Sequence, residues 1–334
     1  MPNVINSCHP GLGVNCNRDT SVHYLYNIFM KRLIECIPNF SEGRDMNVVS
    51  ALAAAAESAP GAVLLDYSAD ADHNRSVFTI LGKPESVAEA AFLMCRAARD
   101  NIDMTKHSGG HPRIGAADVI PFTPVMDGTM DECVEISFMT ARRIYDELGV
   151  PCFLYGESCR REERRDLADI RRGGFEGMPQ KLLLADWAPD FGGRAIHPTA
   201  GVTAVGARKP LVAFNVNLKT PDVSIAKKIA KAIRGSDGGY EFCKAIGVML
   251  ENKGAAQVSM NMTDYNATPI YAVYEAIRAE AGRFGVEVAE SELIGLVPAR
   301  ALADCAAHYL KLGNYDYDRQ ALESHLLRHL DGFE

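Results

Sequence analysis

The chain has 334 residues, of which 47% are hydrophobic and 23% are charged, and its formal net charge at pH 7 is −8. This size and composition are typical of a globular protein of two modest domains. The acidic balance argues against a general nucleic-acid-binding protein, which usually has a basic face. No apolar run is long enough to span a membrane. We therefore expect a cytoplasmic protein with neither nucleic acid nor membrane as a partner.

The nine cysteines are dispersed along the chain without a C-x-x-C pair, which is typical of reduced thiols in a cytoplasmic protein. We expect Cys36, Cys95 and Cys133 to be small buried hydrophobic residues rather than nucleophiles. Residues 1–30 have no periodicity and no basic segment followed by an apolar core. They are predicted to be a poorly ordered N-terminal extension and not a secretory signal.

Apolar periodicity and turn residues define the elements of the first half of the chain. A helix that starts at Pro84 has apolar side chains at 3.6-residue spacing, and Thr129 with Glu132 forms the capping-box pattern of another. The charge-dense residues 160–172 are interpreted as a helix with a solvated face. In chain order, we predict strands at residues 33–37, 63–67, 76–81, 117–125 and 152–155, and helices at residues 46–58, 84 to about 104, 129–148 and 160–172.

The pattern restarts after residues 206–210. Thr220 is predicted to cap a helix with Pro221 at its first position, and Asn252-Lys253-Gly254 indicates a hairpin. The order β-α-β-β-α-β resembles the split βαβ, ferredoxin-like unit, and the first half has a similar rhythm with added elements. We predict strands at residues 211–218, 246–251, 256–261 and 286–289, and helices at residues 221–233, 269–284 and 298–312.

The fold class predicted from this order is α/β (α+β), with two α/β subdomains whose mixed sheets are flanked by helices. The expected boundaries are residues 1–30 for the extension, 31–207 for the N-terminal subdomain and 208–334 for the C-terminal subdomain. Ligand sites are favoured between domains, so we expect the substrates to bind in a cleft between the two subdomains.

The most informative stretch runs from His107 to Asp118 and contains two histidines, an arginine and an aspartate among three glycines and a proline. Gly109-Gly110 disfavours a helix, and Pro112 favours an extended backbone at His111. This is a loop that fixes the direction of polar side chains. One alternative is a turn with a solvated arginine. Another is a zinc site that uses His107 and His111, although Gly109-Gly110 argues against the helix that it needs.

Four segments carry a resemblance to a known family: Glu-Cys-Ile-Pro-Asn-Phe-Ser-Glu-Gly at 35–43, Asn-Arg at 74–75, His-Pro-Arg-Ile-Gly-Ala at 111–116, and Trp-Ala-Pro-Asp-Phe-Gly at 187–192. The order and spacing of these segments make the chain from Ile34 onward resemble the glutamate formimidoyltransferases. These are the folate-dependent transferases of histidine degradation and one-carbon metabolism. The resemblance implies His111 as the catalytic residue, tetrahydrofolate as co-substrate, no metal, and a homodimer. It also implies a folate-binding stretch made of Gly192, Gly193, Arg194, Ala195, Ile196, His197, Pro198, Thr199, Ala200 and Gly201.

The implied reaction moves a formimidoyl group from N-formimidoyl-L-glutamate to tetrahydrofolate, giving 5-formimidoyltetrahydrofolate and L-glutamate. A histidine, with an unperturbed pKa of about 6.5, can take a proton from the attacking nitrogen and return it to the leaving nitrogen. Asp118, or a carboxylate of the Asp70/Asp72 loop, is a candidate to orient the imidazole of His111.

Both substrates carry carboxylates, and arginine grips a carboxylate through two parallel hydrogen bonds. Arg75 and Arg113 are the candidates for this role, with Arg44 as a weaker one. Asn39 is a further substrate-binding candidate because it follows a strand at its carboxyl end, where ligands bind in open α/β sheets. Residues 160–172 could also dock a polyglutamate tail of folate.

Three alternatives to this function stay open. A formyl donor, N-formylglutamate, differs from the formimidoyl donor only in its =O in place of =NH. A metal-dependent hydrolase of C–N bonds could use His107, His111 and Asp118. A non-catalytic folate or small-acid binder is the third. The sequence does not separate these alternatives.

Overall fold

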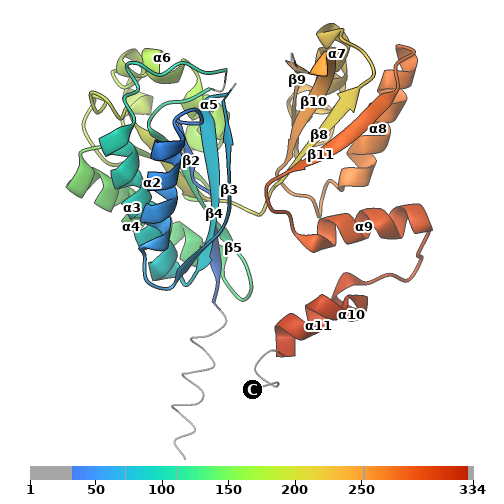
Figure 1. Ribbon diagram of the computed structural model, residues 1–334, viewed down its shortest axis with the longest axis horizontal. Coiled ribbons are helices and arrows are strands. Elements are labelled where there is room, and N and C mark those ends of the chain that lie inside the picture. Colours follow the sequence, from blue (N-terminus) through green and yellow to red (C-terminus); the bar gives the residue numbers. More distant parts are fainter. Residues whose placement is uncertain (1–31, 72, 111, 251–252, 330–334) are drawn as a thin grey trace, which may run out of the picture.

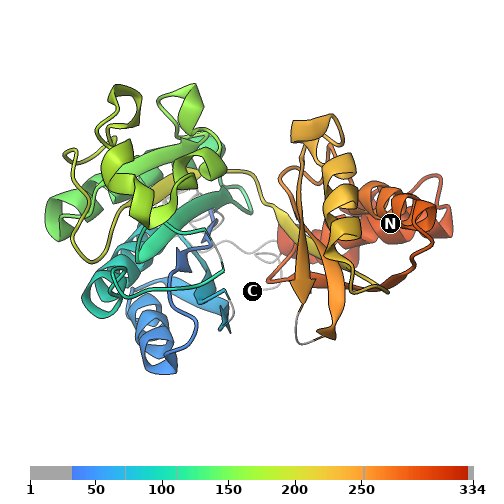
Figure 2. The same ribbon diagram turned by 90° about the horizontal axis from the view of Figure 1, so that it is seen from above.

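The computed structural model describes residues 32–71, 73–110, 112–250 and 253–329. It has two sheets, each with helices of its own and a hydrophobic core of its own, joined by the chain around residues 207–212 (Figures 1 and 2). The predicted fold class, two α/β subdomains with helices flanking their sheets, is confirmed. Residues 1–30, the predicted extension, lie outside the described residues.

The first subdomain alternates strands and helices along the chain, as the periodicity predicts. Its elements are β1 (Ile34–Cys36), β2 (Asn39–Phe40), α2 (Met46–Glu57), β3 (Ala62–Asp70), β4 (Arg75–Gly82), α3 (Pro84–Asn101), β5 (Ala117–Pro124), α4 (Met130–Leu148), β6 (Cys152–Gly156), η1 (Glu162–Arg164), α5 (Leu167–Arg171), α6 (Gly174–Lys181), η2 (Ala185–Trp187) and β7 (Thr203–Ala207).

The strand order of the first sheet contains a split βαβ unit. Strands β1 and β2 follow one another in a single place in the sheet, because both pair with β4 on one side and with β5 on the other. Strand β3 lies beyond β4, so the order is β3, β4, β1/β2, β5. Strands β7 and β6 then extend the sheet in parallel beyond β5. The predicted similarity in rhythm between the two halves is therefore a similarity in topology.

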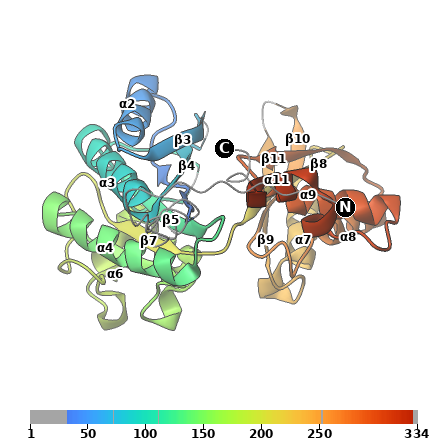
Figure 3. The same cartoon turned by 90° about the horizontal axis from the view of Figure 1, so that it is seen from below.

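Helices cover the two faces of the first sheet unequally. Helices α2, α3 and α4 pack on one face (Figure 3), where the core includes Phe40, Phe78 and Phe122. Helices α5 and α6 pack on the opposite face around Phe153, beside β6 and β7. The residues of β4 and β5 that point away from Phe78 and Phe122 therefore lie on the face that α2, α3 and α4 do not cover.

The second subdomain is a ferredoxin-like unit, as predicted. Its four strands follow the order β11, β8, β10, β9, and every pairing is antiparallel. Its elements are β8 (Val212–Leu218), α7 (Val223–Ile233), η3 (Gly235–Asp237), β9 (Cys243–Leu250), β10 (Ala255–Met262), α8 (Ile270–Arg283), β11 (Val288–Ile294), α9 (Ala299–Leu310), α10 (Tyr317–Gln320) and α11 (Leu322–His329).

The single helix predicted over residues 160–172 is wrong. The segment forms η1 and the five-residue α5, separated where Asp166 caps α5 by accepting a hydrogen bond from the Ala168 N–H at 2.9 Å. Two of its arginines point inward, since Arg164 is 1% exposed and Arg171 binds Asp118. The interpretation as a uniformly solvated face is therefore also wrong.

Smaller corrections concern where elements begin. The N-cap of α7 is Asp222, whose carboxylate accepts from the Ser224 N–H at 2.8 Å, and not Thr220, whose hydroxyl accepts from the Asp222 N–H at 3.1 Å. Aspartate is among the most favoured N-cap residues and ranks above threonine. Residues 203–207 form β7, a buried strand of small residues with weak alternation, and were not predicted to be a strand. Helices α6, α10 and α11 were also not predicted.

The predicted capping box of α4 and the predicted burial of three cysteines are confirmed. The Thr129 hydroxyl accepts from the Glu132 N–H, and the Glu132 carboxylate accepts from the Thr129 N–H at 2.9 Å. Cys36, Cys95 and Cys133 are 0–3% exposed, and burial raises the pKa of the Cys133 thiol to about 12. None of the helices within the described ranges is long and apolar enough to cross a bilayer.

Candidate active site

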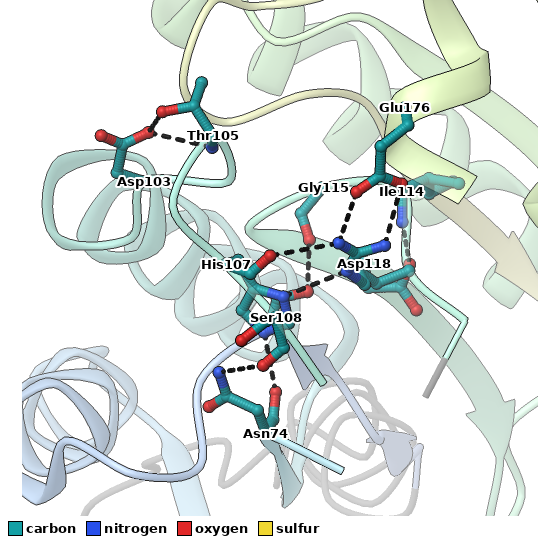
Figure 4. Close-up of polar contacts among 11 residues, drawn as sticks. Asn74, Asp103, Thr105, His107, Ser108, Ile114, Gly115, Asp118 and Glu176 are labelled. Carbon is teal, nitrogen blue, oxygen red and sulfur yellow. Dashed lines mark hydrogen bonds and ion pairs between the residues drawn. The ribbon is translucent and has the colours of Figure 1, made fainter. Parts of the chain in front are cut away.

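The loop that approaches residue 111 is fixed to the turn before β4 by Asn74. Asn74 is 6% exposed and has a φ of 49°, a left-handed conformation that asparagine tolerates better than most residues. Its Oδ1 accepts from the Gly43 N–H at 2.9 Å, and its Nδ2 donates to the Ser108 carbonyl at 3.0 Å. Figure 4 shows the contact between Asn74 and Ser108. Asn74 therefore joins the segments at 35–43 and 74–75 to the loop that leads into the segment at 111–116.

His107 is held in one tautomer by two protein partners. Arg113 Nε donates to His107 Nδ1 at 3.0 Å, so the ring proton is on Nε2, which donates to the Asn74 carbonyl at 3.0 Å. Burial lowers the pKa of His107, and the adjacent Arg113 guanidinium lowers it further. His107 is therefore a neutral structural histidine. With both ring nitrogens occupied, it is not open to a metal ion in this arrangement.

Arg113 is engaged on its outer side by Glu176 of α6. Its two terminal nitrogens donate to the two Glu176 carboxylate oxygens at 3.1 and 2.7 Å, and one of them also donates to the His107 carbonyl at 3.2 Å. The Arg113 side chain is 15% exposed and that of Glu176 is 64% exposed. The Arg113 guanidinium, which was expected to bind a substrate carboxylate, thus binds the carboxylate of Glu176 in this structure.

Asp118 fixes the other end of the loop. It is 1% exposed, and its Oδ1 accepts from the Ile114 N–H at 2.9 Å. Its Oδ2 accepts from Arg171 Nε at 2.9 Å and from a terminal nitrogen of the same guanidinium. Asp118 therefore ties the backbone just after His111 and Arg113 to helix α5.

The C-terminal part of the predicted folate stretch packs directly on this loop. Gly115 and Gly201 form a backbone bridge. A Cβ at Gly115 would lie 2.1 Å from the Val202 carbonyl oxygen, and one at Gly201, which has a φ of 72°, would lie 2.4 Å from the Ile114 carbonyl oxygen. Only glycine allows so close an approach of the two backbones. The loop and the 197–201 turn are thus in contact.

The 192–201 stretch itself forms a bend followed by a tight turn. Gly192 has a φ of 116°, and Arg194 is exposed and donates to the Leu183 carbonyl at 3.0 Å. The backbones of His197 and Gly201 exchange hydrogen bonds of 2.9 and 3.0 Å. The His197 Nδ1 accepts from the Ala200 N–H at 3.0 Å, and burial lowers the pKa of its imidazole.

A buried ion pair fixes the bend that precedes this stretch. Arg164 donates to Asp190 at 2.9 Å and to the carbonyls of Asp186 and Ala188 at 2.7 and 2.6 Å. The Arg164 and Asp190 side chains are 2% and 5% exposed. Asp190 also accepts from the Leu154 N–H at 2.8 Å. The Trp-Ala-Pro-Asp-Phe-Gly segment is therefore attached to η1 by a desolvated guanidinium and to β6 by the Asp190 carboxylate.

Of the predicted substrate-binding residues, Arg75 and Asn39 share the face of the first sheet that α2, α3 and α4 do not cover. Asn39 pairs with Val77, two residues from Arg75 on β4, and directly paired residues point to the same face. The Asn39 Nδ2 donates to the Ile37 carbonyl at 3.0 Å. Burial lowers the pKa of the Arg75 guanidinium, and Arg171 lowers it further, while Asp118 opposes the shift. Arg75, Asp118 and Arg171 are therefore neighbours.

The remaining candidates are partly outside the described residues. His111 and Asp72 are not among those that the structure describes, whereas Gly110 and Pro112, on either side of His111, are exposed. Asp70 accepts from the His73 N–H at 2.9 Å and contacts His73 Nδ1 at 2.8 Å. The Arg44 Nε donates to the Ala71 carbonyl at 2.8 Å. Within the described ranges, no three His, Cys, Asp or Glu side chains are grouped as metal ligands.

Three residues that support the site had no predicted role: Asn74, Arg171 and Glu176. Asn74 belongs to a resembling segment, and that was a usable signal. Arg171 lies in the charge-dense segment that was interpreted as solvated, so nothing in the local pattern pointed to its contact with Asp118. Glu176 lies in a helix that was not predicted, so nothing pointed to it.

Comparisons with known proteins agree with the resemblance. Residues 33–208 match the model of the formiminotransferase domain, N-terminal subdomain, and residues 213–323 match that of the formiminotransferase domain. The chain is 60% identical over 298 residues to a glutamate formimidoyltransferase of Streptococcus pyogenes serotype M1, covering 89% of this chain and 100% of that one. It is 46% identical over 286 residues to a glutamate formimidoyltransferase of Thermoplasma acidophilum, covering 85% and 94%.

A longer relative, the formimidoyltransferase-cyclodeaminase of Gallus gallus, is 45% identical over 287 residues, which cover 84% of this chain and 53% of the relative. The chain therefore spans about half of that protein, whereas it spans the whole of the Streptococcus relative. Since both subdomain models match consecutive parts of the chain and the identity far exceeds what chance allows, the chain belongs to the formiminotransferase family.

Proposed function

We propose that this protein transfers the formimidoyl group from N-formimidoyl-L-glutamate to tetrahydrofolate, in histidine degradation, with His111 as the general acid and base. Relatives named glutamate formimidoyltransferase support the reaction. The observation that carries the residue assignment is the contact between the loop containing His111 and the turn at 197–201. Because of this contact, the proposed proton carrier and the proposed folate-binding turn lie on neighbouring segments.

The proposed chemistry needs one group that titrates near neutral pH. The N5 nitrogen of tetrahydrofolate attacks the amidine carbon of the donor, and His111 takes the proton that this nitrogen loses. His111 then returns a proton to the glutamate nitrogen, and the bond between that nitrogen and the amidine carbon breaks. Proton transfer of this kind typically contributes about a hundred- to ten-thousand-fold in rate. The rest of the rate enhancement comes from holding the two substrates in line.

The described residues around position 111 supply a rigid support for that step. Asn74 binds the Ser108 carbonyl, before His111 in the chain, and Asp118 binds the Ile114 N–H, after it. The Gly115–Gly201 bridge fixes the end of the loop to the 197–201 turn. A catalytic group works best when its supports are locked by packing and hydrogen bonds. We therefore assign Asn74 and Asp118 as positioning residues and do not assign either of them as a proton carrier.

The chemical step is tested by a transfer assay with purified protein, tetrahydrofolate and either N-formimidoyl-L-glutamate or N-formyl-L-glutamate. We expect the formimidoyl donor to be consumed with formation of 5-formimidoyltetrahydrofolate. Preference for the formyl donor would replace the proposal by the formyl alternative. Hydrolysis without folate that a chelator abolishes would favour the metal-dependent hydrolase, and folate binding without turnover of either donor would favour the binder.

Arg75 is the arginine that we propose to bind a substrate carboxylate, because it shares with Asn39 the face of the first sheet that α2, α3 and α4 do not cover. Arg75→Met is expected to raise the KM for the glutamate donor at least about tenfold, since a hydrogen bond to a charged group contributes about 1.5–3 kcal/mol. The control is Arg142→Met, an exposed arginine of α4 that pairs with Asp146, which should leave KM within about twofold. Steady-state kinetics of both variants check this. An unchanged KM for Arg75→Met would transfer the role to Arg113 and require Glu176 to move aside.

We further propose a cytoplasmic homodimer, with subdomains at residues 31–207 and 208–334 and a substrate cleft between them. The described contact of Lys244 on β9 with Asp166 at the start of α5, at 2.6 Å, supports an approach of the two subdomains near the site. The oligomeric state is measured by light scattering of the purified chain.

A further inference from the structure

The Arg113 guanidinium has one side that is fixed within its own loop and one side that is turned outward. Its Nε donates to His107 Nδ1 at 3.0 Å, and a terminal nitrogen donates to the His107 carbonyl at 3.2 Å. The His107 ring is held in turn by the Asn74 carbonyl. These inner contacts therefore keep the guanidinium in place whatever its outer side binds.

The outer side of Arg113 holds the carboxylate of Glu176 in a two-point contact. The two terminal nitrogens donate to the two carboxylate oxygens at 3.1 and 2.7 Å. Figure 4 shows Glu176 directed from α6 toward this loop. Arginine binds the carboxylates of small molecules with the same geometry. Because the Arg113 side chain is only 15% exposed, leaving its guanidinium unpaired would be costly.

Glu176 is the exchangeable member of this ion pair. Its side chain is 64% exposed, and within the described ranges Arg113 is the only side chain to which its carboxylate is hydrogen-bonded. An exposed carboxylate turns into solvent at little cost, because water replaces the hydrogen bonds that it gives up. Glu176 can therefore leave the guanidinium without any movement of the loop.

Helix α6, which carries Glu176, does not need to move for this exchange. Its Met178 is fully buried, and its Phe175 ring lies so close to Gly201 that a Cβ there would be 3.0 Å from it. Its last residue, Lys181, donates to backbone carbonyls at the end of α5. The helix is thus anchored on both sides of Glu176, and only the Glu176 side chain has to rotate.

We propose that Glu176 is an intramolecular mimic of the substrate, which occupies Arg113 while the site is empty and gives way to the α-carboxylate of the glutamate donor when the donor binds. This inference rests on the proposed function and deepens it by assigning a second carboxylate-binding arginine. The donor has two carboxylates, so the assignment adds to that of Arg75. The exchange replaces one ion pair by another, and Arg113 stays paired before and after it.

The position of Arg113 favours the donor over tetrahydrofolate as the source of this carboxylate. Arg113 follows the proposed proton carrier, His111, by two residues. The α-carboxylate of the donor is attached to the same carbon as the nitrogen that receives the proton from His111. The carboxylates of tetrahydrofolate, in contrast, are separated from N5 by an aminobenzoyl group. A carboxylate that lies next to the reacting atoms therefore belongs to the donor.

An internal mimic lowers the apparent affinity for the donor. The apparent dissociation constant rises in inverse proportion to the fraction of molecules in which Arg113 is free to bind the donor. Removing the charge of Glu176 should therefore tighten binding. If Glu176 were only a structural partner of Arg113, its removal would weaken binding instead. The sign of the change in affinity separates the two roles.

The test measures L-glutamate binding by calorimetry, which needs no turnover, together with the KM of the glutamate donor in the transfer assay. Glu176→Gln is expected to bind L-glutamate about three- to tenfold more tightly than the wild type and to lower KM by a similar factor. Its kcat should stay within about twofold. Glu176→Asp, whose shorter side chain does not reach both nitrogens, is a second variant that should tighten binding to a smaller extent.

A double-mutant cycle shows that the effect passes through Arg113. Arg113→Met should weaken L-glutamate binding at least about tenfold, since it removes a charged hydrogen-bonding group. In the Arg113→Met background, Glu176→Gln should have no further effect. Glu147→Gln is the matched control, because Glu147 is an exposed carboxylate of α4 that pairs with Arg143 at 2.7 Å. It should change neither the affinity nor KM.

The inference is overturned if Glu176→Gln leaves L-glutamate affinity unchanged or weakens it, or if its effect persists without Arg113. A lower KM for tetrahydrofolate with unchanged L-glutamate affinity would also overturn it, since Arg113 would then bind the folate tail. In these cases the proposed function stands as long as the wild type transfers the formimidoyl group. If the wild type transfers neither one-carbon group while Glu176→Gln still tightens L-glutamate binding, the proposed function fails and the role of Glu176 is supported.

Discussion

Replacement of His111 by asparagine is expected to lower kcat at least about a hundredfold, because the variant loses the group that moves a proton between the two nitrogens. Folate binding should remain within a few-fold of the wild type, since the turn at 197–201 is held by its own backbone hydrogen bonds and by Gly115. Single-turnover transfer and equilibrium folate binding, measured side by side, check the two parts separately.

The control for His111→Asn is His325→Asn, an exposed histidine on α11 whose ring contacts the Arg319 carbonyl. It should leave kcat unchanged. Turnover of His111→Asn within about threefold of the wild type would reject His111 as the proton carrier, since the contribution of general acid–base catalysis is much larger than that. A chelator should have no effect on either variant.

Replacement of Arg164 by methionine is expected to destabilise the first subdomain by about 3–5 kcal/mol, since breaking a buried ion pair leaves the remaining charge uncompensated. The Asp190 carboxylate would keep only the Leu154 N–H, and the Asp186 and Ala188 carbonyls would lose their donor. Denaturant unfolding gives the change in free energy. Folate affinity should fall as well, because Asp190 holds the bend that begins the 192–201 stretch.

The matched control is Arg165→Met, the next residue in the chain. Arg165 is 47% exposed and pairs with Glu157 and Glu162 on the surface, and exposed pairs contribute about 0–1 kcal/mol. A loss of equal size in the two variants would mean that the cost comes from the segment and not from the desolvated guanidinium.

The loop at 107–118 was predictable because its signals are local: two adjacent glycines, a proline and polar side chains between a helix and a strand. Its supports were not predictable in this way. Asn74, Arg171 and Glu176 are separated from the loop by tens of residues, and their contacts arise only when β4, α5 and α6 pack together. No local pattern records which far side chain will meet a given loop.

The same distinction explains the errors in the fold. Long helices such as α3 and α4 have several turns of periodic apolar side chains, so their sequence alone identifies them. Residues 160–172 have a high density of charges, which usually indicates solvated surface. The burial of Arg164 depends on the distant Asp190, and the break before α5 depends on one cap at Asp166. Arg164 is therefore buried because of its long-range ion pair with Asp190, although the local composition indicates a solvated surface.

The contact of Gly115 with Gly201 has a consequence for how sequence variation in this protein should be interpreted. At both positions even one methyl group would overlap a carbonyl oxygen of the opposite segment, so every larger amino acid is disfavoured there for geometric reasons alone. A mutational survey that finds these two glycines intolerant of change would be reporting the distance between two stretches of backbone. It would not, by itself, mark either residue as a participant in the reaction.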